Sequence, residues 1–221
     1  MDGFFSVNNI VFTVIGYPMS YIEFFGTLLN IWCVYLVAKN KTLNWPVGIV
    51  ATILFGFLFF QINLYADFLE QIYFLLTGFW GWWAWSTGKK SAKEEKPVLA
   101  LSFTSRLGWI LITFVGTLIL GYVDAHLNVY FPKVFTEAAS FPYLDSFTTI
   151  MSFVATILLI HKEFEAWYLW ILVDIIGIWL YWIKDVHFVS ILYVIFFILA
   201  VNGLTTWRKL YKKQQSLQKT I

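Results

Sequence analysis

The chain has very few of the residues that build disulfides, zinc sites and soluble surfaces. One cysteine, Cys33, and three histidines occur among 221 residues, which excludes an intrachain disulfide and leaves no ligand spacing for zinc. The sequence has no glycine–lysine phosphate loop, and Ser152 has no histidine at its depth to activate it. Charged residues make up 13% of the chain, about half the share of a soluble domain. These shortages argue against an enzyme, a bound cofactor or metal, and a soluble domain.

Hydrophobic residues make up 60% of the chain, and aromatic residues make up 21%. A hydrocarbon core of about 30 Å takes roughly 20 residues of helix to cross. We expect seven such helices, near residues 20–38, 45–63, 68–87, 106–122, 146–160, 166–184 and 188–206. The apolar run at 4–15 is shorter, so we expect the segment 1–19 to form a short helix that lies in the membrane interface or crosses as an extra span.

The last third of the chain repeats the first third at an offset of 122 residues. Four pairs of landmarks share this offset: Trp45 with Trp167, Gly81 with Gly203, Trp85 with Trp207, and Glu23 with Asp145. Because three crossings end on the far side of the membrane, one further helix must precede a second copy that runs in the same direction. The sequence thus predicts an all-α integral membrane protein with a 3+1+3 plan of parallel repeats, as some transporters have. Its expected parts are a first repeat at 20–87, a linker at 88–145 with its helix at 106–122, a second repeat at 146–207 and a basic tail at 208–221.

Basic residues are concentrated on one side of the expected spans. Thirteen of the 15 Lys and Arg residues fall in the segments 39–44, 88–106, 161–165 and 207–221. The opposite side has only Lys133 and Lys184. By the positive-inside rule, we expect the basic side and the C-terminal tail to be cytoplasmic. The net charge of +2 is then a signal of topology and does not indicate nucleic-acid binding.

Polar residues near the middle of the spans are candidates for a transport pathway. They form two pairs of repeat partners: Asn30 with Ser152, and Thr52 with Asp174. A carboxylate at mid-depth costs about 2.5–3.5 kcal/mol on insertion scales and is tolerated mainly where it faces protein or water. Two interpretations of Asp174 stay open: a carboxylate that faces a ligand, or an acid that packs between helices. The first is favoured because the same helical face carries Trp167, Trp170 and Tyr181.

Most of the 12 tryptophans lie near the ends of the expected spans, as in the aromatic belts of membrane proteins. Trp82 and Trp170 lie deeper. A tryptophan face beside a carboxylate suits a flat cationic ring, since a desolvated cation–π contact is worth about 2 kcal/mol. The pattern therefore favours an aromatic, positively charged ligand over a neutral sugar.

Several short segments together resemble the PnuC-type family of nicotinamide riboside transporters, and the likeness covers about residues 20–207. They are NWP at 44–46, LYAD at 64–67, GWWAW at 81–85 with Gln71 before it, residues 167–174, LYWIK at 180–184 and SILY at 190–193. The resemblance implies the 3+1+3 plan that is also found in sugar-transporting SWEET proteins. It also implies a binding site near the membrane midplane between the two repeats.

The resemblance also suggests a role for each candidate residue. The pyridinium ring of the riboside would stack on Trp82, Trp170 or Trp182, and Tyr181 and Tyr193 are further candidates for the binding site. The ribose hydroxyls would bond Asn30, Thr52, Gln71 or Ser152, and Asp174 would offset the positive charge. Trp182 lies about 80° away from the Asp174 face and is included on family likeness alone.

The resemblance implies uptake of nicotinamide riboside across a bacterial inner membrane. Facilitated diffusion is the simplest mechanism, and a separate cytoplasmic kinase would trap the vitamin by phosphorylation. Alternatives are a proton-coupled carrier that uses Asp174, a SWEET-like sugar carrier, a carrier of another vitamin such as a thiamin-like cation, and a vitamin-binding subunit that needs an ATPase partner. Glycine-rich helix faces are compatible with a homo-oligomer and equally with packing within one chain.

Overall fold

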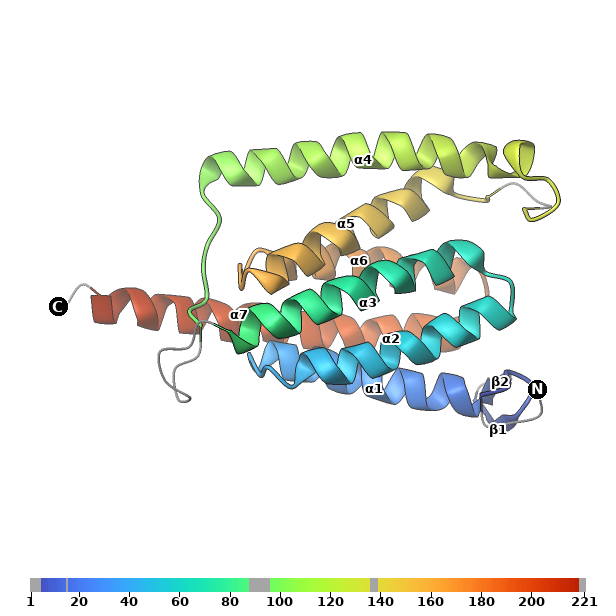
Figure 1. Ribbon diagram of the computed structural model, residues 1–221, viewed down its shortest axis with the longest axis horizontal. Helices are drawn as coiled ribbons and strands as arrows, with labels where there is room; N and C mark the ends of the chain where they lie inside the picture. The colour runs from blue at the N-terminus through green and yellow to red at the C-terminus, as the bar shows by residue number, and fades with distance from the viewer. Residues whose placement is uncertain (1–4, 15, 88–95, 136–138, 219–221) are drawn as a thin grey trace.

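The structure is a computed structural model, and it describes residues 5–14, 16–87, 96–135 and 139–218. The described residues form a β-hairpin followed by seven helices that run side by side (Figure 1). The elements are β1 (Ile10–Val14), β2 (Tyr17–Ser20), α1 (Tyr21–Ala38), α2 (Asn44–Gln61), α3 (Tyr65–Ser86), α4 (Phe103–Tyr130), α5 (Pro142–Ile160), α6 (Ala166–Ile183) and α7 (His187–Gln218). We call the end with β1 and β2 the hairpin end, and the end at which α7 projects beyond the other helices the tail end.

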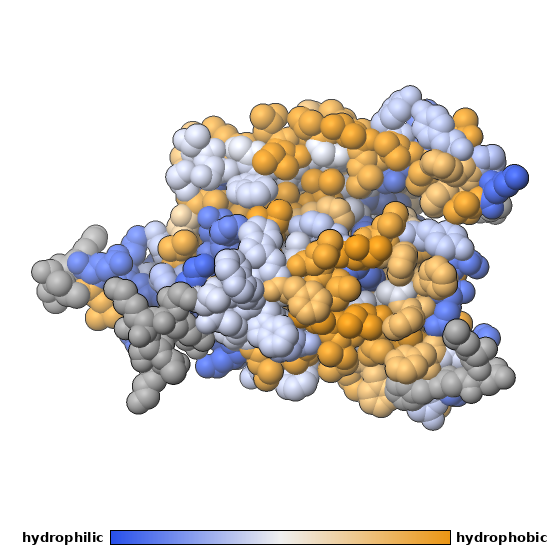
Figure 2. Space-filling view, in the orientation of Figure 1, coloured by the Kyte–Doolittle hydropathy of each residue, from blue (hydrophilic) through white to orange (hydrophobic). Residues whose placement is uncertain are grey.

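Six of the described helices, all except α3, are long and apolar enough to cross a membrane. α3 has 22 residues, which is long enough at 1.5 Å per residue, but its tryptophan, tyrosine and acidic side chains make it less apolar. In Figure 2, apolar residues gather along the middle of the visible face and hydrophilic residues lie toward both ends. The chain is therefore a multi-pass, all-α membrane protein apart from its hairpin.

Two helices are longer than the sequence analysis predicts. α4 covers 103–130 instead of 106–122, and α7 continues through the expected tail as far as residue 218. The extension of α7 stays helical because Leu210 and Tyr211 pack on the core, and because its lysines and glutamines are strong helix formers. The basic tail expected at 208–221 is therefore helical as far as residue 218 and continuous with the last helix of the second repeat. Residues 88–95 of the expected linker and 219–221 of the expected tail lie outside the described residues.

The N-terminal segment contradicts the predicted short helix. β1 and β2 are antiparallel, with Val14 opposite Tyr17. β1 is made of β-branched and aromatic residues, which favour strands, and Gly16 has a φ of +77°, as a tight hairpin turn requires. The expectation of an interfacial helix or an extra span is therefore wrong for the described residues of this segment.

Side chains from three helices hold the hairpin in place. Ser20 and Glu23 form a reciprocal capping box at the start of α1, and the hydroxyl of Tyr17 donates a hydrogen bond to the Glu23 carboxylate. Burial, together with this bond, raises the pKa of Tyr17. The Tyr17 ring stacks on Phe188 of α7 with centroids 5.5 Å apart, and Gln61 of α2 bonds the backbone before β1.

The two three-helix units have matching local structure at the offset of 122 residues. α2 and α6 begin and end at equivalent residues. The turns match as well: Asn40 and Lys162 have φ of 57° and 61°, and Asn63 and Asp185 have φ of 59° and 57°. Such left-handed positions are uncommon for residues other than glycine. The offset therefore relates backbone conformations as well as residue types.

At the tail end, each unit bonds the other through an equivalent tryptophan. Nε1 of Trp85 donates to the carbonyl oxygens of Leu159 and Ile160 at 3.2 and 3.1 Å. Nε1 of Trp207 donates to the carbonyl oxygen of Val37 at 3.1 Å, and Val37 is the repeat partner of Leu159. Both indoles are fully buried, and their rings lie 6.0 Å apart.

A strap formed by residues 96–101 lies across this tryptophan cluster. Val98 of the strap is 1% exposed, and its backbone N–H donates to the side chain of Gln214 on the α7 extension. Two backbone hydrogen bonds join the strap to the turn between α5 and α6. In that turn, Lys162 lies with Nζ 4.1 Å from the Trp85 ring centroid and donates to the carbonyl oxygen of Lys96. The strap therefore ties the α5–α6 turn to α7.

Candidate functional site

The candidate site centres on Asp174, in the middle of α6. Asp174 is 4% exposed, and within the described residues its carboxylate has no hydrogen-bond partner. The Tyr193 ring of α7 lies directly against Gly177, one turn further along α6, and Tyr193 is close enough to Asp174 to interact with it electrostatically. A carboxylate without a partner is costly inside a membrane protein if it is ionised, so Asp174 stays a candidate for contact with a ligand, beside the alternative of an acid that packs between helices.

Two tyrosines from adjacent helices stack on each other on the hairpin-end side of Asp174. The rings of Tyr181 and Tyr193 are stacked, with centroids 5.3 Å apart and an interplanar angle of 20°. Tyr181 is half-buried and lies two helical turns beyond Asp174, toward the hairpin end. The structure thus brings three of the predicted site residues together.

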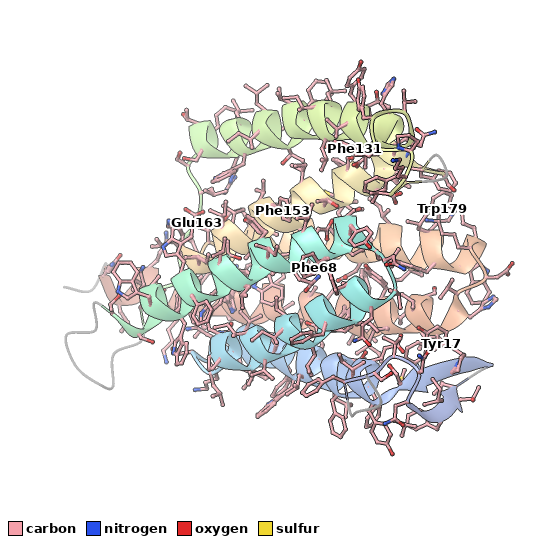
Figure 3. All side chains as sticks on the ribbon, turned by 45° about the vertical axis from the view of Figure 1, so that its right-hand side comes forward. Tyr17, Phe68, Phe131, Phe153, Glu163 and Trp179 are labelled. Atoms are coloured by element: carbon pink, nitrogen blue, oxygen red, sulfur yellow. The ribbon has the colours of Figure 1, made fainter. Side chains whose placement is uncertain are left out.

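α3 and α5 add side chains that the sequence analysis did not select. Thr149 of α5 donates a hydrogen bond to the carboxylate of Glu70 on α3. One turn deeper, the Tyr73 hydroxyl donates to the carbonyl oxygen of Phe153 at 2.8 Å, and the two rings stack at 3.9 Å. Figure 3 shows Phe153 about halfway between the two ends of the bundle, at the junction of α3 and α5. Glu70 falls inside an expected span, at 68–87, but close to its start, where an acid also suits the helix dipole, so the sequence carries only a weak signal for it.

The hairpin-end half of this junction is acidic. Asp67, Glu70 and Asp145 lie close enough together to interact electrostatically, and Asp124 of α4 accepts a hydrogen bond from Ser146 of α5. Lys184 is near Asp67 and Asp145. The described acids outnumber this cation, so a positive ligand is favoured here over a negative one.

The four predicted polar contacts have different environments. Ser152 is buried and donates to the carbonyl oxygen of Thr148 at 2.9 Å, while Asn30 and Thr52 are half-buried. Gln71 is half-buried and makes a 3.5 Å contact with the carbonyl oxygen of Asp67 in its own helix. The repeat partner of Gln71 is Tyr193, so these two residues occupy equivalent positions in the two units.

The three predicted tryptophans do not lie together. Trp170 is half-buried, and its Nε1 is buried without a hydrogen-bond acceptor in the described structure. Trp82 is 42% exposed and Trp182 is 59% exposed. Trp182 lines an exposed apolar groove of α6 and α7 together with Trp179, which Figure 3 labels near the hairpin end of α6. Of the three, only Trp170 has an indole nitrogen that is buried without a hydrogen-bond acceptor in the described residues.

Asp174 is enclosed by protein in this conformation. It lines neither of the two pockets described for the structure. One of these pockets is the groove that contains Trp182, and the other has a volume of about 380 Å³ and lies under the hairpin, between Tyr17, Glu23 and Leu58. The open hollow that the sequence analysis places at mid-depth is therefore not among them, and a ligand would reach Asp174 only after helices move.

Comparison with known proteins identifies the family of this membrane bundle. A family model described as a nicotinamide mononucleotide transporter matches residues 20–209. A nicotinamide riboside transporter PnuC from Escherichia coli (strain K12) is 32% identical over 225 residues, which cover 92% of this chain and 93% of that protein. The chain belongs to the PnuC transporter family. The resemblance given by the sequence is thereby confirmed, and membership of a transporter family confirms that the chain is not an enzyme.

Other PnuC relatives agree with this family. The PnuC of Neisseria mucosa is 27% identical over 95% of this chain and 80% of that protein. A crystal structure of the vitamin B3 transporter PnuC matches with a TM-score of 0.67 and 26% identity, over 87% of this chain and 83% of that one. A riboflavin/roseoflavin transporter, RibM from Streptomyces davaonensis, is 22% identical over 91% of both chains. The wider set of similar proteins thus includes transporters of more than one vitamin with a flat ring.

Proposed function

We propose that the chain carries nicotinamide riboside across a bacterial inner membrane by facilitated diffusion. The observation that carries this proposal is the enclosed carboxylate of Asp174 near Tyr193, whose ring stacks on Tyr181. Nicotinamide riboside is a flat ring with one positive charge joined to a ribose. A buried carboxylate and aromatic rings match the two parts of that ring, because cations bind well over aromatic faces and beside anions.

The proposed path runs between two parallel three-helix repeats, α1–α3 and α5–α7, joined by α4 in the SWEET-like 3+1+3 plan. The equivalent bonds of Trp85 and Trp207 support the same direction for both units, since both bonds lie at the tail end. By the positive-inside rule, the tail end with its lysines faces the cytoplasm and the acidic hairpin end faces outward. A cationic substrate would then meet acidic side chains first.

In this proposal each predicted side chain keeps a role at the enclosed site. Asp174 pairs with the ring charge, Tyr181 and Tyr193 stack on the ring, and Nε1 of Trp170 donates to the carboxamide oxygen. The polar residues contact the ribose once the helices have moved: Asn30, Thr52, Gln71 and Ser152. Trp82 and Trp182 remain stacking candidates from the family resemblance.

Transport by facilitated diffusion needs a step that keeps the substrate inside. A riboside kinase in the cytoplasm would phosphorylate the released riboside and give it a charge that the acidic pathway does not accept. In the proposal this kinase acts on the free substrate and does not need to bind the chain. A homo-oligomer would leave the mechanism unchanged, because the site is made within one chain.

A flavin is the second candidate substrate, and the similarity to the riboflavin/roseoflavin transporter RibM favours it. Riboflavin is neutral, so it would leave Asp174 without a charged partner, and on this ground we rank it below the riboside. The same argument counts against a SWEET-like sugar carrier. A vitamin-binding subunit that depends on an ATPase partner would bind the riboside without moving it.

Uptake by purified protein in liposomes with no energy source tests the proposal. We expect labelled nicotinamide riboside to enter until the inside concentration equals the outside one, while protein-free liposomes take up little. Enclosing a riboside kinase with ATP should raise accumulation above that level. Uptake of riboflavin but not of the riboside would favour the flavin carrier, and binding without uptake would favour the partnered subunit.

A further inference from the structure

The two helix pairs that join the repeats differ in chemistry although they occupy equivalent positions. α3 packs against α5, and α7 packs against α1. In the first pair, Glu70 accepts a hydrogen bond from Thr149. The equivalent residues of the second pair are Leu192 and Thr27. A carboxylate therefore occurs at only one of two related positions, and helix packing at this depth does not require it.

Glu70 lies next to the enclosed site. Tyr193 is close enough to interact electrostatically with both Glu70 and Asp174. Asp67 of α3 also interacts with Tyr193, so carboxylates from both repeats lie near this one tyrosine: Asp67 and Glu70 from the first and Asp174 from the second. Glu70 is the sixth residue of α3, which begins at the hairpin end, whereas Asp174 lies at the middle of α6. A substrate entering from the hairpin end would thus pass Glu70 before it reaches Asp174.

No cation of the described residues pairs with Glu70. Its hydrogen-bond donor in the described structure, Thr149, is a neutral hydroxyl. The charged groups that act on Glu70 are the acids Asp67, Asp124 and Asp145. Lys184 acts on Asp67 and Asp145 and is not among the groups that act on Glu70. A carboxylate held among acids at a helix junction is stabilised strongly by an incoming cation.

We propose that Glu70 receives the positively charged aromatic ring on its way to Asp174 and exchanges its hydrogen bond with Thr149 for contact with that ring. This role rests on the proposed function, because it takes the substrate to be a cationic riboside. The hydrogen bond joins the first repeat to the second, so arrival of the cation loosens the α3–α5 junction when the substrate loads. Glu70 is thus a substrate-contacting residue that also links loading to movement of the repeats.

Glu70→Gln tests the role with two ribosides of nearly equal shape, cationic nicotinamide riboside and its neutral 1,4-dihydro form. The amide oxygen of glutamine can still accept the hydrogen bond from Thr149, so the fold is retained while the charge is lost. We expect the KM for the cationic riboside in liposome uptake to rise at least tenfold, and the KM for the neutral form to change less than twofold.

Asp185→Asn is the matched control. It removes one negative charge at the hairpin end from an exposed residue, and asparagine suits the φ of 57° at that position. We expect less than a twofold change in KM for either riboside. If Asp185→Asn weakens uptake of the cation as much as Glu70→Gln does, the effect comes from overall charge and the proposal is wrong.

Thr149→Val gives a second measurement that does not change Glu70. It removes the hydroxyl that competes with the ring for the carboxylate, so we expect an unchanged or lower KM for the cationic riboside. If the bond between Glu70 and Thr149 were only a structural link, Thr149→Val and Glu70→Gln would both lose uptake of both ribosides. That result would overturn the proposal. If the wild-type chain itself does not take up the cationic riboside, the proposed function has failed; if it does and Glu70→Gln affects both ribosides equally, only the role of Glu70 has failed.

Discussion

The tail end and the hairpin end join the two repeats in different ways. At the tail end the contacts are symmetric: the ring pair Trp45–Trp85 packs at 84°, and the equivalent pair Trp167–Trp207 packs at 85°. Nearer the hairpin end, the two described junctions between the repeats differ: α3–α5 has a hydrogen-bonded carboxylate, Glu70, and α1–α7 has none at the equivalent position. The contacts between the two repeats are therefore symmetric at the tail end and asymmetric in the hairpin-end half.

The contacts that hold the repeats together are thus different from the residues proposed to bind the substrate. The tryptophan bonds go to backbone carbonyl oxygens, which every residue type has, so they place no demand on a ligand. The proposed substrate has no two-fold symmetry, because only one end of it is charged. A site that fits it must therefore depart from the symmetry of the repeats. Asp174, whose repeat partner is Thr52, departs from the symmetry in the same way.

The largest expected effect concerns the symmetric contacts at the tail end. Trp85→Ala and Trp207→Ala should each lower the free energy of unfolding by about 3–5 kcal/mol, because each removes a fully buried indole and its hydrogen bonds. Thermal unfolding of the purified protein in detergent measures both losses. Trp83→Ala is the control, since Trp83 is 64% exposed, and it should cost far less. Clearly unequal losses for Trp85 and Trp207 would break the symmetry inferred for this end.

A smaller effect is expected at the asymmetric pair Asp174 and Thr52. Asp174→Asn should weaken binding of the cationic riboside about tenfold, which corresponds to about 1.4 kcal/mol, and leave binding of the neutral dihydro form nearly unchanged. Thr52→Val should weaken both forms equally, since a hydroxyl contact does not depend on the ring charge. Calorimetric titration measures all four affinities. The same loss for both forms in Asp174→Asn would contradict the charge pairing.

The smallest effect is expected at the hairpin. Ser20→Ala removes the side-chain cap of α1 and should cost about 1 kcal/mol of stability. The KM for riboside uptake should stay within twofold of the wild-type value, because the capping box lies outside the junction of the repeats. Thermal unfolding and liposome uptake of one variant check both statements. A large change in KM would bring the hairpin into the transport pathway.

The helices were predictable from the sequence, whereas the hairpin was not. Long apolar runs fix the presence of membrane helices, and the offset of 122 residues relates their ends. The short apolar run at 4–15 fits a strand as well as a helix, because periodicity does not separate the two over so few residues. The turn at Gly16 was the available signal. Whether Gly16 marks a hairpin turn depends on whether the segments on either side of it pair as strands, and the local sequence does not show that pairing.

The candidate site was predictable in part, for a similar reason. Asp174 is conspicuous because it lies at mid-span, and the family resemblance pointed to Tyr193. Glu70 lies near the start of α3, where an acid also suits the positive end of the helix dipole, so its position alone did not indicate a site. Its bond with Thr149 depends on how α3 is rotated and tilted against α5. Trp182 is more exposed than Trp170. This difference depends on how α6 is rotated against its neighbours, which the sequence does not show either.

α7 is one unbroken helix from residue 187 to residue 218. At 1.5 Å per residue its length is about 48 Å, and a rod of that length that tilts by about 5° about its middle moves each end by about 2 Å. Tyr193 lies near one end of the rod, and Gln214, which holds the strap, lies near the other. A tilt that makes room for a ring beside Tyr193 must therefore also pull on Val98, so the two faces of the membrane are mechanically connected through a single piece of backbone.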